Sequence, residues 1–411
     1  MKVRINGRKQ LDRIDAITSK SFVHRMLIAA ALSDTETVIR TNVFSQDMRA
    51  TAECLIALGA EIEETEDSFV VKEGVTHVGK AVLNCYESGS TARFMMPLGA
   101  IYADYATFEG SGKLPERPQS ALTDVLREHG CNILDDYLPL TITGELKSGK
   151  FEIRGDVSSQ YITGLLIALP LLDGDSEIVL TTPLSSKGYI DITLSVLRTF
   201  KIDVEETGRG YRICGGQKYV SPRVIEAEAD WSNGAALLVM NEVSEPVNVC
   251  GLNMNSVQGD RAIVDIIESY RKSDIGVRSF DIKNIPDIAP YIAVLGFMSK
   301  SETLLLNTAR LRIKESDRAE AIVSVLKAFG CFAEIVDSLE EENIVIGTSN
   351  KAQIEEGTVI TVDGMGDHRI VMMEAMMSLA SNVPVIINGA EAVNKSYPGF
   401  FELFDTEVLE G

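Results

Sequence analysis

Residues 311–318 carry the densest chemistry in this sequence. They read Leu-Arg-Ile-Lys-Glu-Ser-Asp-Arg and hold three cations and two carboxylates. If the segment is helical, Lys314 and Arg318 lie four apart on one face, with Glu315 three residues before Arg318. That face would bind an anion with a carboxylate beside it. The alternative is a solvated helix with salt bridges, which an isolated run of charges usually forms.

Polar or cationic side chains also precede apolar stretches at six further places. A helix start offers free backbone N–H groups and partial positive charge, so several converging starts could hold more than one anionic group. Each start alone could equally be an ordinary N-cap or a capped turn. The six places are Thr18–Ser21 with Arg25 after them, Glu87–Arg93, Arg117 before Pro118, Ser158–Gln160, Gly364–Arg369 and Asn394–Pro398.

Two carboxylates could complete such a site. Asp287 follows Ile285 and Pro286 and precedes an apolar stretch, so it is either a helix cap or a functional group. Near bound anions, Asp287 and Glu315 would have unequal surroundings, which suits one as a base and the other as an acid. The single tryptophan, Trp231, is expected to pack rather than to catalyse.

The composition excludes several classes of partner. The 411 residues carry 60 acidic and 39 basic side chains, a net charge of −21 that repels nucleic acid and anionic membranes. No apolar run approaches the roughly 18 residues of a membrane span, and the first residues lack a signal-peptide core, so we expect a cytoplasmic protein. Six scattered cysteines and four histidines without ligand spacing indicate neither a disulfide framework nor a metal site.

A period of about seventy residues organises the chain. Each copy predicts an amphipathic helix that ends near a Gly or Lys, followed by a strand, a turn and a second strand such as Phe69–Val71 or Ile344–Ile346. Six units would fill the chain, in two similar halves that meet near 221–223, which indicates a mixed α and β class. The clear copies are 55–62, 126–133, 197–204 and 326–333, with a weaker copy at 267–270.

Taken in order, these motifs resemble those of the 5-enolpyruvylshikimate-3-phosphate synthases. The resemblance runs from about residue 11 to 405. It rests on Ser19–Ser21 with Arg25, Gly89–Arg93, Glu116–Pro118, Ser158–Gln160, Lys187–Asp191, Arg312–Arg318, Asp367–Arg369 and Lys395.

The resemblance implies both a reaction and a fold. The family transfers the enolpyruvyl group of phosphoenolpyruvate to the 5-hydroxyl of shikimate 3-phosphate and releases phosphate, on the route to chorismate and aromatic amino acids. It uses no metal and no organic cofactor, and its partners are these two small molecules; we expect a monomer. The implied architecture is the α/β, two-domain enolpyruvyl transferase fold with six βαβαββ-type units, three per domain. The expected lobes are 14–226 and 1–13 plus 227–411, with the active site in the cleft between them.

The resemblance also implies roles for individual residues. Asp287 would accept the 5-hydroxyl proton, while Glu315, assisted by Lys20, would protonate the methylene carbon on the way to a tetrahedral intermediate. Shikimate 3-phosphate would be held by Lys20, Ser21, Arg25, Ser158, Ser159, Gln160, Ser186, Asp287 and Lys314. Phosphoenolpyruvate would be held by Lys20, Gly89, Arg117, Gln160, Arg318, Arg369 and Lys395.

This sequence departs from the family pattern at three places. Ile17-Thr18 replaces the usual Pro-Gly, Glu87 replaces an asparagine, and Gly188 replaces a proline. Glu87 adds negative charge close to where an anionic substrate would bind.

Two other functions are compatible with parts of the pattern. A related transferase that acts on UDP-N-acetylglucosamine typically has a catalytic cysteine in the loop before Arg117, and residues 109–116 contain none. A non-catalytic phosphoanion-binding scaffold would need the cations but neither Asp287 nor Glu315.

Overall fold

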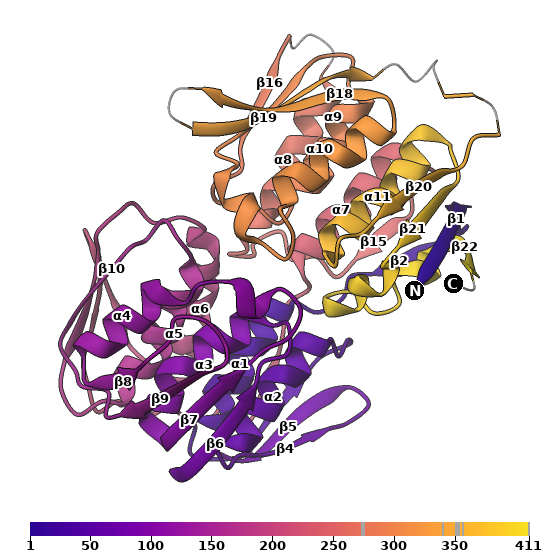
Figure 1. The fold of residues 1–411 in the computed structure, drawn as a ribbon. Helices are drawn as coiled ribbons and strands as arrows, with labels where there is room; N and C mark the ends of the chain where they lie inside the picture. Colours follow the sequence, from indigo (N-terminus) through magenta and orange to yellow (C-terminus); the bar gives the residue numbers. More distant parts are fainter. Residues whose placement is uncertain (273–275, 339–340, 350–353, 356, 410–411) are drawn as a thin grey trace. The chain divides into compact units, whose positions relative to one another are not determined.

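The computed structural model describes residues 1–272, 276–338, 341–349, 354–355 and 357–409 (Figure 1). The chain forms two compact units: unit 1 is Met1–Ile17 with Ala229–Gly411, and unit 2 is Thr18–Glu228. These divisions fall a few residues beyond the predicted ones at 13 and 226. The reason lies in strand pairing, because Arg13–Asp15 pairs with a strand of unit 1.

One sheet pattern recurs in both units. In the described residues five sheets have four strands, and in each the first two strands are parallel while the other two run antiparallel to their neighbours. A sixth sheet keeps only the parallel pair. Units 1 and 2 contain three sheets each. The predicted mixed α/β fold built from six repeats is therefore confirmed.

Unit 2 contains three four-stranded sheets, whose strands follow in spatial order. The first comprises β14 (Val224–Glu226), β3 (Thr37–Arg40), β5 (Ser68–Glu73) and β4 (Glu61–Glu64). The second comprises β6 (Val78–Asn84), β7 (Ala103–Glu109), β9 (Leu140–Gly144) and β8 (Cys131–Ile133). The third comprises β10 (Lys150–Ile153), β11 (Ser176–Leu180), β13 (Gly210–Ile213) and β12 (Glu205–Thr207).

Unit 1 repeats the arrangement, and one of its sheets uses both ends of the chain. That sheet comprises β20 (Ile360–Asp363), β21 (Val385–Asn388), β1 (Lys2–Arg8) and β22 (Phe404–Leu409). Another comprises β16 (Arg278–Asp281), β17 (Thr303–Leu306), β19 (Glu341–Ser349) and β18 (Cys331–Ser338). The two-stranded sheet joins β15 (Asn248–Cys250) and β2 (Arg13–Asp15).

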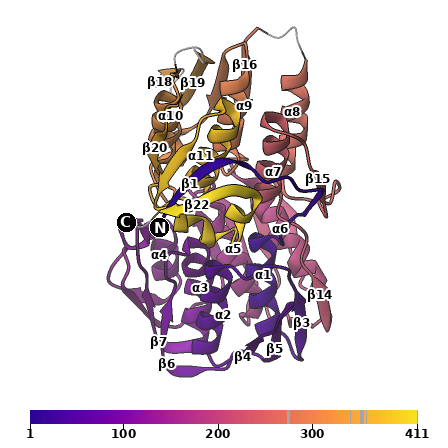
Figure 2. The ribbon, with the colours of Figure 1, turned by 90° about the vertical axis from the view of Figure 1, so that its right-hand side faces the viewer.

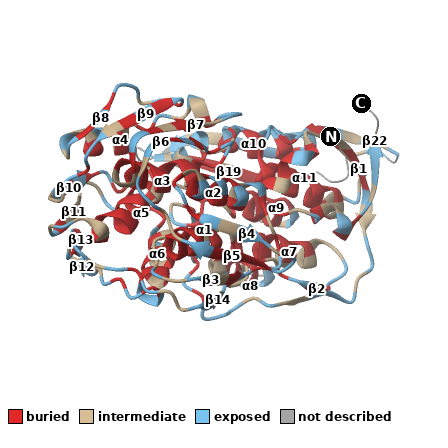
Figure 3. Cartoon of the chain, turned by 90° about the horizontal axis from the view of Figure 1, so that it is seen from below, coloured by how far each residue is buried: buried red, intermediate tan, exposed pale blue. Residues whose placement is uncertain are grey.

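The helices of each unit are packed between its sheets (Figures 1 and 2). Figure 3 shows that many residues of the helices are buried. Their sequences explain this, because a helix such as α9 (Ala289–Met298) is apolar on all sides. Unit 2 contains α1 (Lys20–Ala31), α2 (Gln46–Ala57), α3 (Gly89–Tyr102), α4 (Ser120–Glu128), α5 (Ser159–Ala168) and α6 (Lys187–Thr199). Unit 1 contains α7 (Trp231–Val243), α8 (Ile263–Arg271), α9 (Ala289–Met298), α10 (Arg318–Ala328) and α11 (His368–Ser381).

The turn that ends each clear repeat has a left-handed backbone. After α2, α4 and α10 the residue is a glycine, Gly59, Gly130 or Gly330, with φ of 91°, 100° and 73°. After α6 it is Lys201, with φ of 64°. Glycine adopts this conformation without steric cost, so the Gly or Lys noted in the sequence marks the turn into the next strand.

Two of the six repeats depart from the predicted order of helix, strand, turn and strand. After α8 the next described strand is β16, so among the described residues no hairpin follows the weaker copy at 267–270. In the unit of β20 and β21, two short 3₁₀ helices, η6 (Ala390–Lys395) and η7 (Phe400–Leu403), stand where a second α-helix occurs elsewhere. Among the described helices, none combines the length and apolar character needed to cross a bilayer.

Candidate active site

In unit 2, the first residue of α1 is a shielded cation. Lys20 Nζ donates to Asp47 Oδ2 at 2.8 Å, and only 16% and 14% of the two side chains are exposed. Asp47 lies in the first turn of α2, and it was not among the predicted site residues. Its position at a helix start hides this contact in the sequence, because a carboxylate there usually complements the helix dipole.

Arg25, on the same helix, is a buried cation surrounded by neutral groups. Its Nε donates to Thr193 Oγ1 at 2.7 Å, and its Nη atoms donate to the backbone oxygens of Ser21 at 2.7 Å and Tyr189 at 3.1 Å. Its guanidinium also lies over the ring of Phe94, 4.8 Å from the centroid. Burial lowers the pKa of Arg25 to about 9. An approaching anion would therefore meet a cation whose charge no described carboxylate neutralises.

A second cationic group lies at the start of α3. A Cβ added to Gly89 would stand 3.2 Å from Arg117 Nη1 and 3.6 Å from Arg93 Nη1, so two guanidinium groups converge on this glycine. Arg93 Nη1 donates to Gln160 Oε1 at 2.5 Å, and Gln160 Nε2 donates to Ser90 Oγ at 2.8 Å. Arg93 belongs to a predicted motif but had no predicted role, and its contacts place it with Gly89 and Gln160.

The predicted serines lie at two further helix starts. Ser158 Oγ accepts from the backbone N–H of Gln160 at 3.3 Å and so caps α5, while Ser159 is the first residue of that helix. Ser186 precedes α6 with a left-handed φ of 57°. All three serines are buried. Arg25 reaches α5 and α6 through Thr163 and Tyr189, so hydrogen bonds connect the N-terminal parts of α1, α5 and α6.

The helix start predicted at Arg117 differs in detail. Pro118 does not lie in the first turn of α4, which begins at Ser120. A 3₁₀ turn, η1 (Leu114–Glu116), precedes Arg117, and Arg117 itself is extended. The proline favours this extended backbone in the residue before it.

In unit 1, three carboxylates converge on Arg318. Its Nη1 donates to Asp287 Oδ1 at 2.8 Å, its Nη2 to Glu315 Oε2 at 2.7 Å, and its Nε to Asp367 Oδ2 at 2.9 Å. The Arg318 side chain is wholly buried. Burial alone would lower the pKa of Arg318, but the three carboxylates raise it well above its usual value. Asp367 belongs to a predicted motif without a predicted role, and it is the buried partner of Arg318.

The segment 311–318 is not one helix, so the condition for placing Lys314 and Arg318 on one helical face is not met. The 3₁₀ helix η4 (Ala309–Ile313) ends before Lys314, and α10 begins at Arg318 with Asp317 as its cap. Lys314 Nζ nevertheless lies 3.3 Å from Asp287 Oδ1, the same oxygen that Arg318 contacts. Burial lowers the pKa of Lys314, and the neighbouring Asp287 opposes that shift.

The solvated salt-bridge alternative describes only part of this segment. Arg312 pairs with Asp317, Glu320 and Glu342 at its exposed side. The N-cap position of α9 is Ile288, so Asp287 lies one residue before the position that the capping alternative requires. Its side chain contacts Arg318 and Lys314.

The last two predicted cations are also buried in unit 1. Arg369 Nη1 donates to Asn233 Oδ1 at 2.7 Å and to the Tyr291 hydroxyl at 3.0 Å. Lys395 Nζ donates to the backbone oxygen of Gly366 at 2.7 Å. Lys395 ends η6, and the helix expected after Asn394–Pro398 is present as the 3₁₀ helix η7. Trp231 is fully buried and donates through Nε1 to the Asn253 backbone, so it packs as expected.

Asp260 is a buried acid that was not predicted from the sequence. It accepts a short hydrogen bond from the Ser232 hydroxyl, and its pKa is raised to about 7 by burial and by the charge of Asp287. Its position in the 3₁₀ helix η3 (Gly259–Ala262) gave no signal, because a single aspartate in a loop usually lies in solvent.

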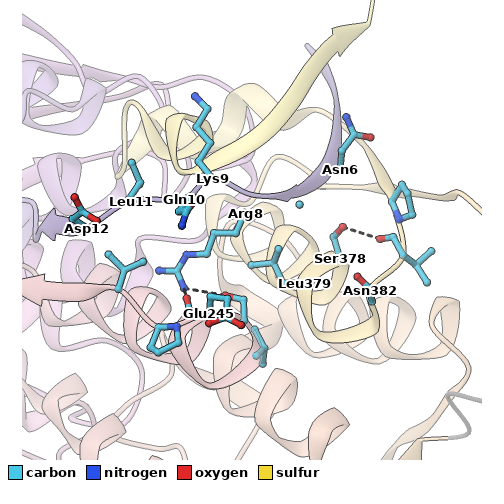
Figure 4. A pocket seen from close by; sticks show the side chains of 17 residues that line it. Asn6, Arg8, Lys9, Gln10, Leu11, Asp12, Glu245, Ser378, Leu379 and Asn382 are labelled. Carbon is cyan, nitrogen blue, oxygen red and sulfur yellow. Dashed lines mark hydrogen bonds between the residues drawn. The ribbon is translucent and has the colours of Figure 1, made fainter.

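A cavity of ≈ 810 Å³ in unit 1 lies apart from these groups (Figure 4). Its lining contains none of the predicted site residues. It lies beside the ends of α7 and α11, and Arg8 Nη1 donates there to Ser244 Oγ at 2.9 Å and to the Glu245 backbone oxygen at 2.8 Å. A cation stabilises a helix C-terminus, so Arg8 has a structural role that explains its place in the lining.

Comparison with known proteins identifies the family of the chain. The chain matches the model of EPSP synthase (3-phosphoshikimate 1-carboxyvinyltransferase) over residues 5–404. A 3-phosphoshikimate 1-carboxyvinyltransferase of Clostridium kluyveri is 40% identical, with 98% of this chain and 96% of that protein covered. The corresponding protein of Clostridium novyi is 37% identical, with 94% and 93% covered.

Solved structures share the fold. EPSP synthase from Acinetobacter baumannii has a TM-score of 0.76 at 21% identity over the whole of both chains. The enolpyruvyl transferase NikO from Streptomyces tendae has a TM-score of 0.73 at 14% identity, covering 99% of this chain and 98% of its own. At these identities the likeness concerns the fold alone.

Proposed function

The chain belongs to the EPSP synthase family, and on that premise we propose how its residues carry out the family's reaction. The protein is a transferase of the shikimate pathway. It moves the enolpyruvyl group of phosphoenolpyruvate to the 5-hydroxyl of shikimate 3-phosphate and releases phosphate. The observation that carries this function is the family match across residues 5–404.

Shikimate 3-phosphate is held chiefly by unit 2 in this proposal. Arg25 supports the assignment, because a buried guanidinium with only neutral described contacts gains most from a bound dianion. The other proposed contacts come from helix starts, whose N–H groups favour phosphate oxygens. They are Lys20, Ser21, Ser158, Ser159, Gln160 and Ser186, joined by Asp287 and Lys314 of unit 1.

Phosphoenolpyruvate is held by cations from both units. In unit 2, Arg117 and the bare backbone of Gly89 lie together, and Gln160 is joined to them through Arg93. Lys20 belongs to both substrate sets. In unit 1 the proposed contacts are Arg318, Arg369 and Lys395, each of which is buried and therefore desolvated in advance. A desolvated cation interacts more strongly with phosphate and carboxylate groups than one in water does.

The proposed chemistry is an addition followed by an elimination. Asp287 accepts the proton of the 5-hydroxyl while the hydroxyl oxygen bonds to C2 of phosphoenolpyruvate. Glu315, assisted by Lys20, delivers a proton to the methylene carbon. The deprotonated Glu315 then takes a proton back from that methyl group as the C2–O bond to phosphate breaks, which restores the double bond and releases phosphate. No covalent enzyme intermediate, metal or organic cofactor is part of this scheme.

The position of the two carboxylates supports a shared site for proton transfer. Asp287 accepts from Arg318 Nη1 and Glu315 accepts from Arg318 Nη2. One guanidinium therefore holds both carboxylates, which places the proposed base and the proposed acid beside each other.

The net charge of the chain bears on its partners. A net charge of −21 supports small anions bound at local cationic groups, and it disfavours nucleic acid as a partner. We expect the protein to act in the cytoplasm as a monomer. Light scattering of the purified protein tests the monomer directly.

A paired-substrate assay tests the function. Phosphate should be released only when shikimate 3-phosphate and phosphoenolpyruvate are both supplied, and each substrate alone gives the background. Turnover with UDP-N-acetylglucosamine in place of shikimate 3-phosphate would contradict the assignment. Binding of both substrates without any turnover would instead favour the non-catalytic scaffold.

A further inference from the structure

A buried chain of side-chain hydrogen bonds crosses three helices of unit 2. His24 Nδ1 on α1 lies 2.6 Å from Thr51 Oγ1 on α2, and Thr51 Oγ1 lies 2.7 Å from Thr91 Oγ1 on α3. Thr91 Oγ1 donates to Ser88 Oγ at 2.7 Å. All four side chains are at most 1% exposed, so water does not compete for these bonds.

The hydrogen bond from Thr91 to Ser88 determines which group donates and which accepts in the other hydrogen bonds of this series. Because the Thr91 hydroxyl donates to Ser88, it can only accept from Thr51. The Thr51 hydroxyl therefore spends its single proton on Thr91 and must accept from His24. His24 is thus the tautomer with its proton on Nδ1, and its Nε2 is a buried atom without a described hydrogen-bond partner.

The ring of His24 is held neutral by its surroundings. Burial lowers the pKa of His24 well below its ordinary value, and the charges of Lys20 and Arg25 lower it further. The ring also meets Phe94 edge to face at 6.3 Å, and Phe94 carries the Arg25 guanidinium on its face. A neutral imidazole has one donor and one acceptor, so the proton on Nδ1 is the only one that it can give to Thr51.

The far end of the chain is the cap of α3. Ser88 Oγ accepts from the Thr91 backbone N–H at 3.3 Å, and Gly89 follows Ser88 as the first residue of the helix. Arg93 lies one turn later and contacts Gln160. The chain therefore connects the helix that carries Lys20 and Arg25 to the helix start that carries Gly89 and Arg93.

We propose that His24 is a positioning residue for phosphoenolpyruvate: through Thr51 and Thr91, its Nδ1–H sets where the start of α3 presents Gly89 and Arg93. This inference rests on the function proposed above. His24 touches neither substrate in the proposal and acts only through the three hydroxyl groups.

A matched pair of variants separates this role from simple core packing. His24→Asn keeps an N–H donor close to the position of Nδ1, whereas His24→Leu fills similar space without a donor. We expect His24→Leu to raise KM for phosphoenolpyruvate about tenfold, as for one lost buried hydrogen bond, and His24→Asn to restore most of that loss. KM for shikimate 3-phosphate should change by less than about twofold in both. His129→Leu, outside the chain of hydrogen bonds, is the control and should change neither KM.

The results distinguish the failure of the function from the failure of the positioning role. If the wild-type protein releases no phosphate with both substrates, the proposed function fails. If the wild type turns over but the Leu and Asn variants have the same KM for phosphoenolpyruvate, or both KM values rise together, the positioning role fails. Should His24→Leu not fold, Thr51→Val against Thr51→Ser asks the same question, because only Ser keeps the hydroxyl.

A direct measurement of the tautomer adds a second test. With four histidines in the chain, ¹⁵N-histidine spectra of the wild type and of His24→Asn assign the His24 ring by difference. The expected signal is a neutral ring protonated on Nδ1 that does not titrate between about pH 6 and 8. A ring protonated on Nε2, or one that titrates in this range, would overturn the proposal.

Discussion

The guanidinium of Arg318 donates to the carboxylate of Asp287 at 2.8 Å, although the arginine side chain is completely shielded from water. Lys314 shares the same carboxylate oxygen. The Asp287 carboxylate therefore lies against a fully buried arginine and a partly exposed lysine. Hydrogen bonds from cations favour a charged carboxylate, which the proposed role of Asp287 as proton acceptor requires.

Neutralising either proposed proton-transfer group should affect turnover far more than binding. We expect Asp287→Asn and Glu315→Gln each to lower kcat by about 10²- to 10⁴-fold, the usual share of general acid–base catalysis, with small changes in the dissociation constants. Steady-state kinetics and calorimetric titration measure the two effects. Asp317→Asn is the control, because asparagine caps a helix as well as aspartate does and should keep kcat within about twofold. Unchanged kcat in both carboxylate variants would remove the mechanism.

Removing the charge of Arg25 should separate stability from binding. Arg25→Met eliminates a buried cation that no described carboxylate neutralises, so the free energy of unfolding should change by no more than about 1 kcal/mol. KM for shikimate 3-phosphate should rise by about tenfold or more, because a charge-assisted contact to phosphate is lost. Urea unfolding and kinetics provide the two numbers.

The control for Arg25 is an exposed arginine of the same unit. Arg49 pairs with Glu64 at the surface, and Arg49→Met should leave KM unchanged. A strongly destabilised Arg25→Met variant with normal KM would show that Arg25 serves the fold and not the substrate.

A single methyl group at Gly89 should disturb phosphoenolpyruvate binding. The added Cβ would lie 3.2 Å from Arg117 Nη1, which is tighter than ordinary contact, so the guanidinium must shift by a few tenths of an ångström. We expect Gly89→Ala to raise KM for phosphoenolpyruvate about tenfold with an unchanged melting temperature. Gly208→Ala, whose Cβ would meet nothing within 4 Å, is the control. Equal kinetics for the two variants would contradict the proposed place of Arg117.

Much of the repeat architecture could be predicted from the sequence because it is locally encoded. The turn after each clear copy needs a left-handed backbone, and Gly59, Gly130 and Gly330 supply it wherever a helix passes into a strand. The starts of α1, α3, α5 and α11 were predicted because short polar residues precede an apolar stretch. Ser88, Ser158 and Asp367 cap α3, α5 and α11 through their side chains, whereas Ser19 makes no side-chain cap on α1. These signals lie within a few residues of the feature that they specify.

The partners of the charged groups could not be predicted, because they depend on elements that pack from elsewhere in the chain. Asp47 reaches Lys20 from a different helix, and Asp367 reaches Arg318 across 49 positions. The break at residues 314–317 was hidden because the charge spacing also suits a continuous helix. Spacing alone does not determine which of two compatible backbones a segment adopts.

Loss of Lys395 should weaken phosphoenolpyruvate binding with little effect on the chemical step. Lys395 is 8% exposed and donates to a backbone oxygen, so its ammonium group is largely desolvated and would interact strongly with an anion. We expect Lys395→Met to raise KM for phosphoenolpyruvate by about tenfold or more and to lower kcat by less than about threefold. Lys300→Met, in the turn before β17, is the matched control and should change neither constant. An unchanged KM in Lys395→Met would exclude Lys395 from the site.

Glu374 on α11 should destabilise the folded protein as the pH rises. It is 0% exposed, and neither of its carboxyl oxygens has a described hydrogen-bond partner. Burial raises its pKa well above the ordinary value, and the charges of Asp363 and Asp367 raise it further. The folded state therefore keeps the proton that the unfolded chain loses above about pH 4.3. Below about pH 4.3 the carboxyl is protonated in both states, and its ionisation does not lower the stability of the fold. Above that pH the unfolded chain gains free energy by losing the proton, so the folded protein becomes less stable until the pH reaches the folded pKa of Glu374.

Glu374→Met tests whether Glu374 lowers the stability of the folded protein as the pH rises, because it removes the carboxyl and fills similar space. Urea unfolding from about pH 5 to 8 should show a variant that is more stable than the wild type, with an advantage that grows by at most about 1.4 kcal/mol per pH unit while the folded carboxyl stays protonated. The exposed Glu320 provides the matched control, since Glu320→Met removes the same charge without relieving burial. An advantage for Glu374→Met that stays constant with pH would mean that the carboxyl ionises equally in both states, and would refute the argument from burial.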